Sequence, residues 1–386
     1  MRVRRLIVTK LLEYLASSEA NRASMTEAFP ALHDADEREL DWLMRAGLGP
    51  LLYRATGKGA TAPARWRGKL FAADLNAQLL SRKRIETATE IIDECLARGI
   101  PVTLLKGISV SEAYYPAPHL RPMLDVDLLV PADAYGDLEN ALLRRGFMHG
   151  AEMLDTSKHG TPLHHPKLKV CVELHTALFE AHNPLRSGRS FGAEQVATER
   201  VESSFHGRRV YRLSDALQLA YTACGWVRDQ RTTTRPRFLL QPILDMVCVV
   251  ATRGEAIDWE KLVDAMEGQA ARLSTFLGLG YLAHLCPGAV PSRVLQRLAA
   301  QSAVGQREAK VVNAILDAQV LRGPLNLRII ALDTMLGHGS FVGKLLRVPW
   351  NLVFPPGEPG RYSARFHVDR VRFHLDRVAR MLRQPS

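Results

Sequence analysis

Helical hydrophobic periodicity dominates both ends of the chain. At the end of the N-terminal region, "NAQLLSRKRIETATEIIDECLARG" spaces its apolar and small residues three to four apart, and its last residue, Gly99, is a stop signal. From about residue 184 onward the pattern is again mostly helical, and Ser214 stands where it can cap a helix through "DALQLAYTACGWVRDQ". Both regions are therefore predicted to be built from helices.

The pattern between these regions changes to short runs of β-branched and apolar residues. "IPVTLLKG", "LDVDLLV" and "KLKVCVELHTAL" are predicted as strands. "SVSEAYY" and "AYGDLENALLRR" are predicted as helices, the second capped by Asp133 and ended by Gly146. The expected fold class is α+β, with a sheet core at 99–183, an N-terminal helical region at 1–98 and a C-terminal helical region at 184–386.

The composition is that of a chain with a sizeable core. The 386 residues are 47% hydrophobic and 24% charged, which suggests two or three domains. The five cysteines form no CxxC pair, so neither a disulfide framework nor a zinc site is indicated. The apolar run "FLLQPILDMVCVV" is too short to span a bilayer and contains Asp245. We therefore expect a soluble, cytoplasmic protein.

The positive charge of the chain is concentrated at its C-terminus. The net charge is +11, and the stretch 361–386 holds seven arginines against Asp369 and Asp376. This tail is predicted to be an amphipathic helix. Its apolar face is formed by Val368, Val371, Leu375, Val378 and Leu382. Packing of that face on the protein is the first expectation, and binding to RNA or to an anionic membrane surface is the alternative.

Two aspartates interrupt the second predicted strand. Asp125 and Asp127 alternate with apolar residues and so point to the same face, where two carboxylates repel each other. A divalent cation between them makes the pair favourable, and oxygen ligands of this kind suit Mg²⁺ or Mn²⁺. Glu173, on the face of the third strand opposite Val172 and Leu174, can supply a third acid if the two strands are neighbours.

Groups that suit a phosphate chain precede the acid pair. At the end of the first strand, Gly107 allows close approach of backbone N–H groups, Lys106 supplies charge and Ser109 a hydroxyl. Arg121, four residues before Asp125, can clamp a triphosphate oxygen. His175 faces the same side as Glu173 and is expected either to orient an acceptor or, more simply, to be a hydrogen-bonded structural histidine.

Taken together, these motifs resemble a known family. "LLKGISVSEAYYPAPHLRPMLDVDLLV", followed by "VELH", is similar to the uncharacterised bacterial nucleotidyltransferases of the DNA polymerase β-like superfamily. The resemblance implies the minimal nucleotidyltransferase sheet, with Asp125, Asp127 and Glu173 as metal ligands. It also implies that residues 107–109 form the nucleotide-binding turn.

The resulting hypothesis is metal-dependent transfer of a nucleoside monophosphate from a nucleoside triphosphate such as ATP. Two Mg²⁺ ions would be held by the acids, and the acceptor would be a hydroxyl of a small molecule, a saccharide or a peptide. Asp127→Asn is expected to abolish transfer and, by relieving repulsion, to leave thermal stability unchanged or higher.

Other functions are compatible with the same motifs. Toxin-like enzymes of the same superfamily nucleotidylate tRNA or proteins. A glycosyltransferase can use D-x-D to hold Mn²⁺ and a nucleotide-sugar, although such folds place an α/β half before the motif, where this chain has mainly helices. An inactive basic binding module is the non-enzyme alternative, and retention of all three acids argues against it.

Overall fold

The computed structural model describes residues 2–18, 21–22, 29–150, 161–180, 183–230, 236–302, 304–322, 328, 331–332, 334–335 and 341–353. The chain divides into two compact units, one of residues 1–229 and 235–303 and one of residues 230–234 and 304–386. The predicted basic tail at 361–386 lies outside the described residues. The division into three regions at 98 and 183 stays a prediction.

Helices form the first part of the first unit. The N-terminal helical pattern corresponds to α1 (Arg2–Ala16), α3 (Pro30–His33), α4 (Glu37–Arg45), α5 (Gly49–Ala55) and α6 (Ala64–Ala97). Helix α6 ends just before Gly99, whose φ of 67° lies in the left-handed region that glycine adopts without strain. The sequence pattern thus predicted the C-terminal part of this long helix and its stop.

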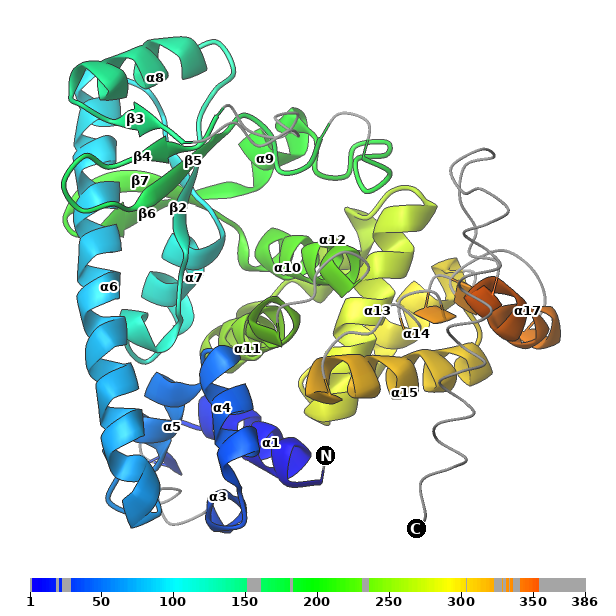
Figure 1. The fold of residues 1–386 in the computed structure, drawn as a ribbon. Helices are drawn as coiled ribbons and strands as arrows, with labels where there is room; N and C mark the ends of the chain where they lie inside the picture. The colour runs from blue at the N-terminus through cyan, green and yellow to red at the C-terminus, as the bar shows by residue number, and fades with distance from the viewer. Residues whose placement is uncertain are drawn as a thin grey trace. The chain divides into compact units, whose positions relative to one another are not determined.

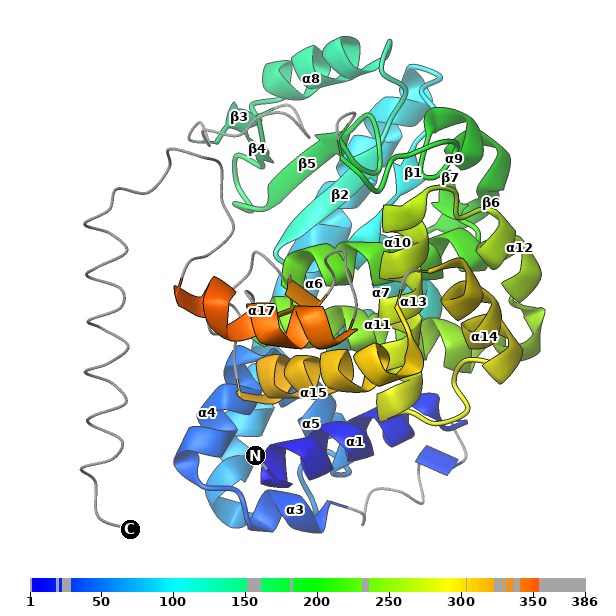
Figure 2. The same ribbon diagram turned by 90° about the vertical axis from the view of Figure 1, so that its right-hand side faces the viewer.

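A mixed sheet of seven strands follows α6. Its strands are β1 (Thr103–Leu104), β2 (Asp125–Leu129), β3 (Met148–His149), β4 (Leu163–His164), β5 (Cys171–His175), β6 (Arg200–Phe205) and β7 (Arg208–Leu213), in the spatial order β3-β4-β5-β2-β1-β7-β6. Strands β2 and β5 pair in parallel, as do β1 and β7, and the other neighbours are antiparallel. Figure 2 shows β2 beside β5. The expected α+β class, a sheet with helices before and after it, is confirmed.

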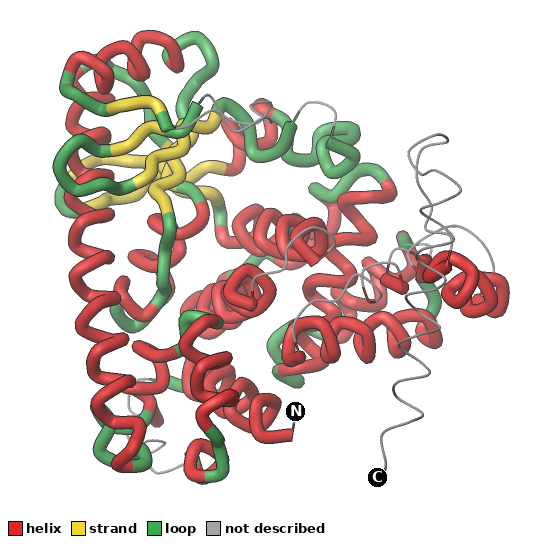
Figure 3. Tube along the Cα trace, viewed as in Figure 1, coloured by secondary structure: helices red, strands yellow, loops and turns green. Residues whose placement is uncertain are grey.

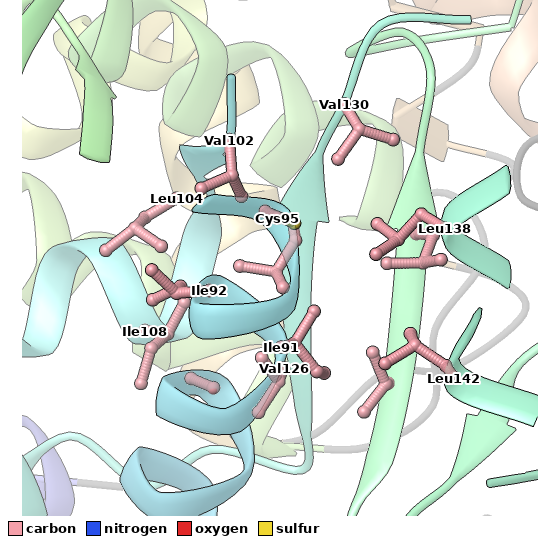
Figure 4. Close-up of a cluster of buried hydrophobic side chains, with 14 of the residues drawn as sticks. Ile91, Ile92, Cys95, Val102, Leu104, Ile108, Val126, Val130, Leu138 and Leu142 are labelled. Atoms are coloured by element: carbon pink, nitrogen blue, oxygen red, sulfur yellow. The ribbon is translucent and has the colours of Figure 1, made fainter. Parts of the chain in front are cut away.

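One face of the sheet carries the hydrophobic core. Helix α6 runs along this face and α8 (Tyr135–Arg144) packs beside it (Figure 1). Val126 of β2 belongs to the same buried cluster as Ile91, Ile92 and Cys95 of α6 and Leu138 of α8 (Figure 4). Because strand side chains alternate, burial of Val126 on this face directs Asp125 and Asp127 to the opposite face.

The structure differs from the sequence pattern in the hairpin β6–β7. It lies in the region expected to be mostly helical and adds two strands to the edge of the sheet. The turn consists of His206 and Gly207, with φ of 47° and 81°, which suits a two-residue hairpin turn. Histidine is less common than asparagine or aspartate at the first position of such a turn, so the turn signal in the sequence was weak.

Two predicted helix starts have different outcomes. Ser214 caps α10 (Asp215–Gln230), because its Oγ accepts a hydrogen bond from the N–H of Leu217 at 3.3 Å. Helix α8 instead begins after Ala134, with no side-chain cap, so Asp133 does not play the expected role.

Further helices complete the first unit. They are α7 (Lys106–Tyr114), α9 (Ala193–Glu199), α11 (Pro236–Arg253), α12 (Trp259–Asp264), α13 (Gln269–Leu285) and α14 (Ser292–Gln301), with short 3₁₀ turns η2 (Pro118–Leu120) and η3 (Gly254–Ala256). Figure 3 shows the strands gathered in one part of this unit, with helices making up most of the rest. Trp226 is fully buried and stacks on Tyr281, with ring centroids 5.0 Å apart.

The second unit contains α15 (Gln306–Arg322) and α17 (Phe341–Val353). A buried ion pair joins these helices, between Lys344 Nζ and Glu308 Oε1 at 2.8 Å. In the described part of the chain, no helix combines the length and the apolarity needed to cross a membrane.

Candidate active site

The acidic face of the sheet opens into a cleft of about 270 Å³. One wall is formed by Asp125, Asp127 and Glu173 together with the β1–α7 junction at Lys106 and Gly107. Residues of α10 and α11 form the opposite wall, among them Gln218, Tyr221, Thr222, Gln241 and Asp245. All of these residues belong to the first unit, so the cleft lies within one compact body.

Parallel pairing of β2 and β5 brings the acids together. Asp127 and Glu173 are register partners on neighbouring strands, and His175 stands two residues farther along β5. Ligand atoms of these three side chains all lie within 4.8 Å of one another. Asp125 lines the same cleft at the start of β2 but is not part of this close cluster. Two carboxylates at such distances offer oxygen ligands that fit a divalent cation, and the imidazole lies beside them.

Lys106 occupies the space beside the two carboxylates. Its Nζ lies 2.5 Å from Asp127 Oδ1 and 3.8 Å from Glu173 Oε2. The residue has a φ of 42°, a left-handed conformation that costs energy for a residue other than glycine. The strained turn between β1 and α7 thus directs an ammonium group to the carboxylates, where its charge offsets their mutual repulsion.

His175 is buried and holds Asp127 from the other side. Its Nε2 lies 2.8 Å from Asp127 Oδ1 and 3.6 Å from Glu173 Oε2, and only 1% of the side chain is exposed. Burial, followed by the charge of Lys106, lowers the pKa of His175, so the neutral imidazole is favoured. A neutral ring donating to Asp127 corresponds to the simpler of the two expectations for this residue, a hydrogen-bonded histidine.

The three acids have divergent pKa values. Burial, and then repulsion by Asp127, raises the pKa of Asp125 to about 6 and that of Glu173 to about 7. Burial would also raise the pKa of Asp127, but the Lys106 ammonium and the His175 hydrogen bond hold it well below its usual range. Asp127 is therefore ionised at neutral pH, whereas Glu173 retains a proton part of the time when no cation is bound.

The structure separates the residues predicted to bind phosphate. Gly107 lines the cleft, and a Cβ built on it would lie 2.7 Å from Arg121 Nη1 and 2.9 Å from Met123 Cγ, so a larger residue would force a neighbour to shift. Arg121 also lines the cleft and forms an ion pair with Asp245. Ser109 does not line the cleft; it is buried, and its carbonyl oxygen accepts a hydrogen bond from Arg212 Nη1 at 2.5 Å.

Sequence reasoning missed the wall formed by α10 and α11. Tyr221 is buried against Phe179 and Phe191, and its hydroxyl has no hydrogen-bond partner among the described residues. Gln241 Oε1 likewise has no donor there. The one available signal was Asp245, an acid inside the apolar run "FLLQPILDMVCVV", which pointed to a buried charge that needs a partner.

A family model decides the assignment. The model described as "uncharacterised nucleotidyltransferase" matches residues 34–287 of the 386-residue chain. The chain belongs to this family. The matched segment contains every residue that lines the cleft, and membership in the uncharacterised nucleotidyltransferases makes the protein an enzyme of the transferase class. It also agrees with the resemblance that the acid and glycine motifs indicated.

The other comparisons are more distant. A solved structure of the antibiotic-resistance factor ANT(2'')-Ia is 16% identical in sequence and covers 53% of this chain and 98% of its own, with a TM-score of 0.33. No curated protein matches the chain. The family model, and not the structural likeness, therefore carries the assignment to the uncharacterised nucleotidyltransferases.

Proposed function

We propose that this family member is a metal-dependent nucleotidyltransferase that moves a nucleoside monophosphate from a nucleoside triphosphate to a hydroxyl of an acceptor and releases pyrophosphate. The observation that carries the proposal is the convergence of Asp127, Glu173 and His175 with Lys106 on one wall of a cleft. Family membership supplies the reaction class, and the cluster offers the charges that this reaction needs.

The acids are the proposed ligands of Mg²⁺ or Mn²⁺. Asp127 and Glu173 would hold the ion, with Asp125 completing the acidic wall from the start of β2. When bound, a divalent ion neutralises triphosphate charge and lowers the pKa of an attacking hydroxyl. The depressed pKa of Asp127 favours this role, because a ligand carboxylate must be ionised.

The remaining groups have proposed roles in substrate binding. Lys106 and Arg121 would balance the charge of the phosphates, and Gly107 would let the chain approach them closely. His175 would keep the Asp127 carboxylate in place through its 2.8 Å hydrogen bond. Ser109 has no direct contact to offer, because it is buried outside the cleft.

The acceptor is proposed to be a small molecule, a saccharide or a peptide. The wall of α10 and α11 presents the Tyr221 hydroxyl and the Gln218 and Gln241 amides, which suit an acceptor with several hydroxyl or amino groups. Nucleotidylation of tRNA or of a protein is the alternative.

The test is a transfer assay with each of the four α-labelled nucleoside triphosphates, in Mg²⁺ or Mn²⁺, with and without cell extract. We expect label to move to an extract component with the native enzyme, and at least a thousandfold more slowly with Asp127→Asn, since the metal then loses a charged ligand (on the order of 4 kcal/mol).

A matched control separates chemistry from folding. Asp93→Asn removes a carboxylate from a surface ion pair with Arg208, far from the acids in the sequence, and should leave transfer unchanged. If the native protein neither binds nor transfers any of the four nucleotides under these conditions, the proposed function is wrong.

A further inference from the structure

Asp245 is a buried acid that the proposed mechanism does not yet use. It lies in the middle of α11, only 3% exposed, among apolar residues such as Leu244 and Met246. An ionised carboxylate in such surroundings is costly unless it is paired and hydrogen-bonded. Its partners therefore indicate why the chain keeps it.

The principal partner is Arg121, which lies 124 residues earlier in the sequence. Arg121 donates to Asp245 through Nε at 2.9 Å and through Nη2 at 2.7 Å, so the guanidinium is held by two parallel hydrogen bonds. Burial alone would lower the pKa of Arg121, but the charge and hydrogen bonds of Asp245, with smaller contributions from Tyr115 and Asp127, raise it. The guanidinium therefore stays charged and has a single orientation.

Two more side chains fix the carboxylate itself. The Tyr115 hydroxyl donates to Asp245 Oδ1 at 2.8 Å, and Gln241 Nε2 lies 2.8 Å from the Tyr115 oxygen and 3.2 Å from Asp245 Oδ1. This network joins α11 to the end of α7. Asp245 cannot turn away without breaking several buried hydrogen bonds.

The geometry leaves one edge of the guanidinium for a ligand. Asp245 occupies Nε and Nη2, and no described residue accepts a hydrogen bond from Nη1. Nη1 faces the β1–α7 junction, since a Cβ on Gly107 would lie 2.7 Å from it. Arg121 and Gly107 both line the cleft that contains the acids.

We infer that Asp245 is a positioning residue for substrate binding: it orients Arg121 so that the Nη1 edge meets the phosphates of a nucleoside triphosphate at the β1–α7 junction. The inference rests on the proposed function and adds to it a residue from outside the sheet core. Through Asp245, helix α11 contributes to the site without touching the substrate phosphates.

The test is a double-mutant cycle on nucleotide affinity. Dissociation constants are measured for the four Mg²⁺-nucleoside triphosphates with the native chain, Asp245→Asn, Arg121→Gln and the double variant. We expect Asp245→Asn to weaken binding about tenfold, as loss of one oriented charge-assisted contact does. The double variant should bind no more weakly than Arg121→Gln alone, because Asp245 acts only through Arg121.

The chain supplies a matched control and a second variant. Arg208 and Asp93 form the same two-bond pair on the surface, at 2.6 and 2.9 Å, so Asp93→Asn tests the loss of such a pair away from the cleft and should bind like the native chain. Arg121→Lys keeps the charge but loses the second edge of the guanidinium. It should also bind about tenfold more weakly, and it serves if Asp245→Asn does not fold.

The outcomes separate this inference from the proposed function. Native-like affinity in Asp245→Asn, or losses that multiply in the double variant, would overturn the inference while leaving the proposed function intact. Native-like affinity in Arg121→Lys would overturn it as well. A native chain that binds none of the four nucleotides would remove the proposed function itself, and the inference with it.

Discussion

At the scale of single residues, the neighbouring carboxylates of β2 and β5 have opposite electrostatic environments. Lys106 lies 2.5 Å from Asp127 but 3.8 Å from Glu173, so one ammonium favours the first charge much more than the second. Asp127 is thus stabilised as an anion, while Glu173 experiences chiefly burial and the repulsion of Asp127. The two acids should respond differently when their charges are removed.

Glu173→Gln should stabilise the protein in the absence of divalent cations. Between the usual carboxyl pKa of about 4.5 and the raised value of about 7, the unfolded chain releases the Glu173 proton while the folded chain keeps it. The native protein therefore loses stability as pH rises through this window. We expect the difference in free energy of unfolding between Glu173→Gln and the native protein to increase by about 2–3 kcal/mol from pH 4.5 to pH 8.

Urea unfolding in EDTA at several pH values measures this difference. Asp127→Asn is the matched comparison and should destabilise, because a depressed pKa adds stability above the unfolded value and Lys106 loses its nearest partner. Carboxylate repulsion alone predicted that Asp127→Asn would leave thermal stability unchanged or higher. The ion pair between Lys106 and Asp127 reverses that prediction, because the substitution also removes this pair. If this difference in unfolding free energy stayed constant with pH for Glu173→Gln, the raised pKa of Glu173 in the folded protein would be contradicted.

At the scale of elements, the β1–α7 junction places the ammonium-bearing Lys106 directly before Gly107. Strand β1 ends at Leu104 and α7 begins at Lys106, so a single residue separates the sheet from the helix. The positive φ of Lys106 makes this abrupt turn possible. Gly107 then lies so close to Arg121 and Met123 that an added side chain would force one of them to shift.

Gly107→Ala should weaken nucleotide binding and also lower the free energy of unfolding. The added methyl group would lie 2.7 Å from Arg121 Nη1 and 2.9 Å from Met123 Cγ, and Arg121 cannot yield easily because Asp245 holds it. We expect at least tenfold weaker binding of Mg²⁺-nucleoside triphosphates, with a stability loss of about 1–3 kcal/mol, measured by titration and urea unfolding.

The control for this substitution is Gly136→Ala. Gly136 lies in the first turn of α8, where an added Cβ meets nothing within 4 Å. That variant should bind nucleotides normally and be stabilised by up to about 1 kcal/mol. Equal loss of affinity in both variants would show that the close packing at Gly107 has no special part in binding.

At the scale of the whole molecule, the net charge of +11 bears on the acceptor. Binding of an RNA acceptor to basic side chains would release counterions from the RNA. The affinity of the protein for the RNA would then fall by about 10³-fold or more between 50 and 200 mM salt. We expect instead that transfer to the labelled acceptor changes only about twofold over this range, as befits a small molecule, a saccharide or a peptide. The transfer assay repeated at increasing salt measures this, and a steep loss would favour tRNA as the acceptor.

The sequence by itself determined the local features of this protein. Alternation along β2 placed Asp125 and Asp127 on one face, helical spacing and Gly99 marked α6, and Ser214 marked the start of α10. These features depend on side-chain periodicity and on capping within a few residues, so they can be read without knowing which segments meet. The combined motifs also sufficed to indicate the family.

Only the tertiary structure decided which of these groups act together. Pairing of β2 with β5 set Asp127 beside Glu173, and the strained turn at Lys106 brought an ammonium to both. The pair between Arg121 and Asp245 joins residues 124 positions apart. Such contacts depend on strand order and helix packing, which periodicity does not specify, because one amphipathic pattern fits many partners. For the same reason the wall of α10 and α11 became visible only in the folded chain.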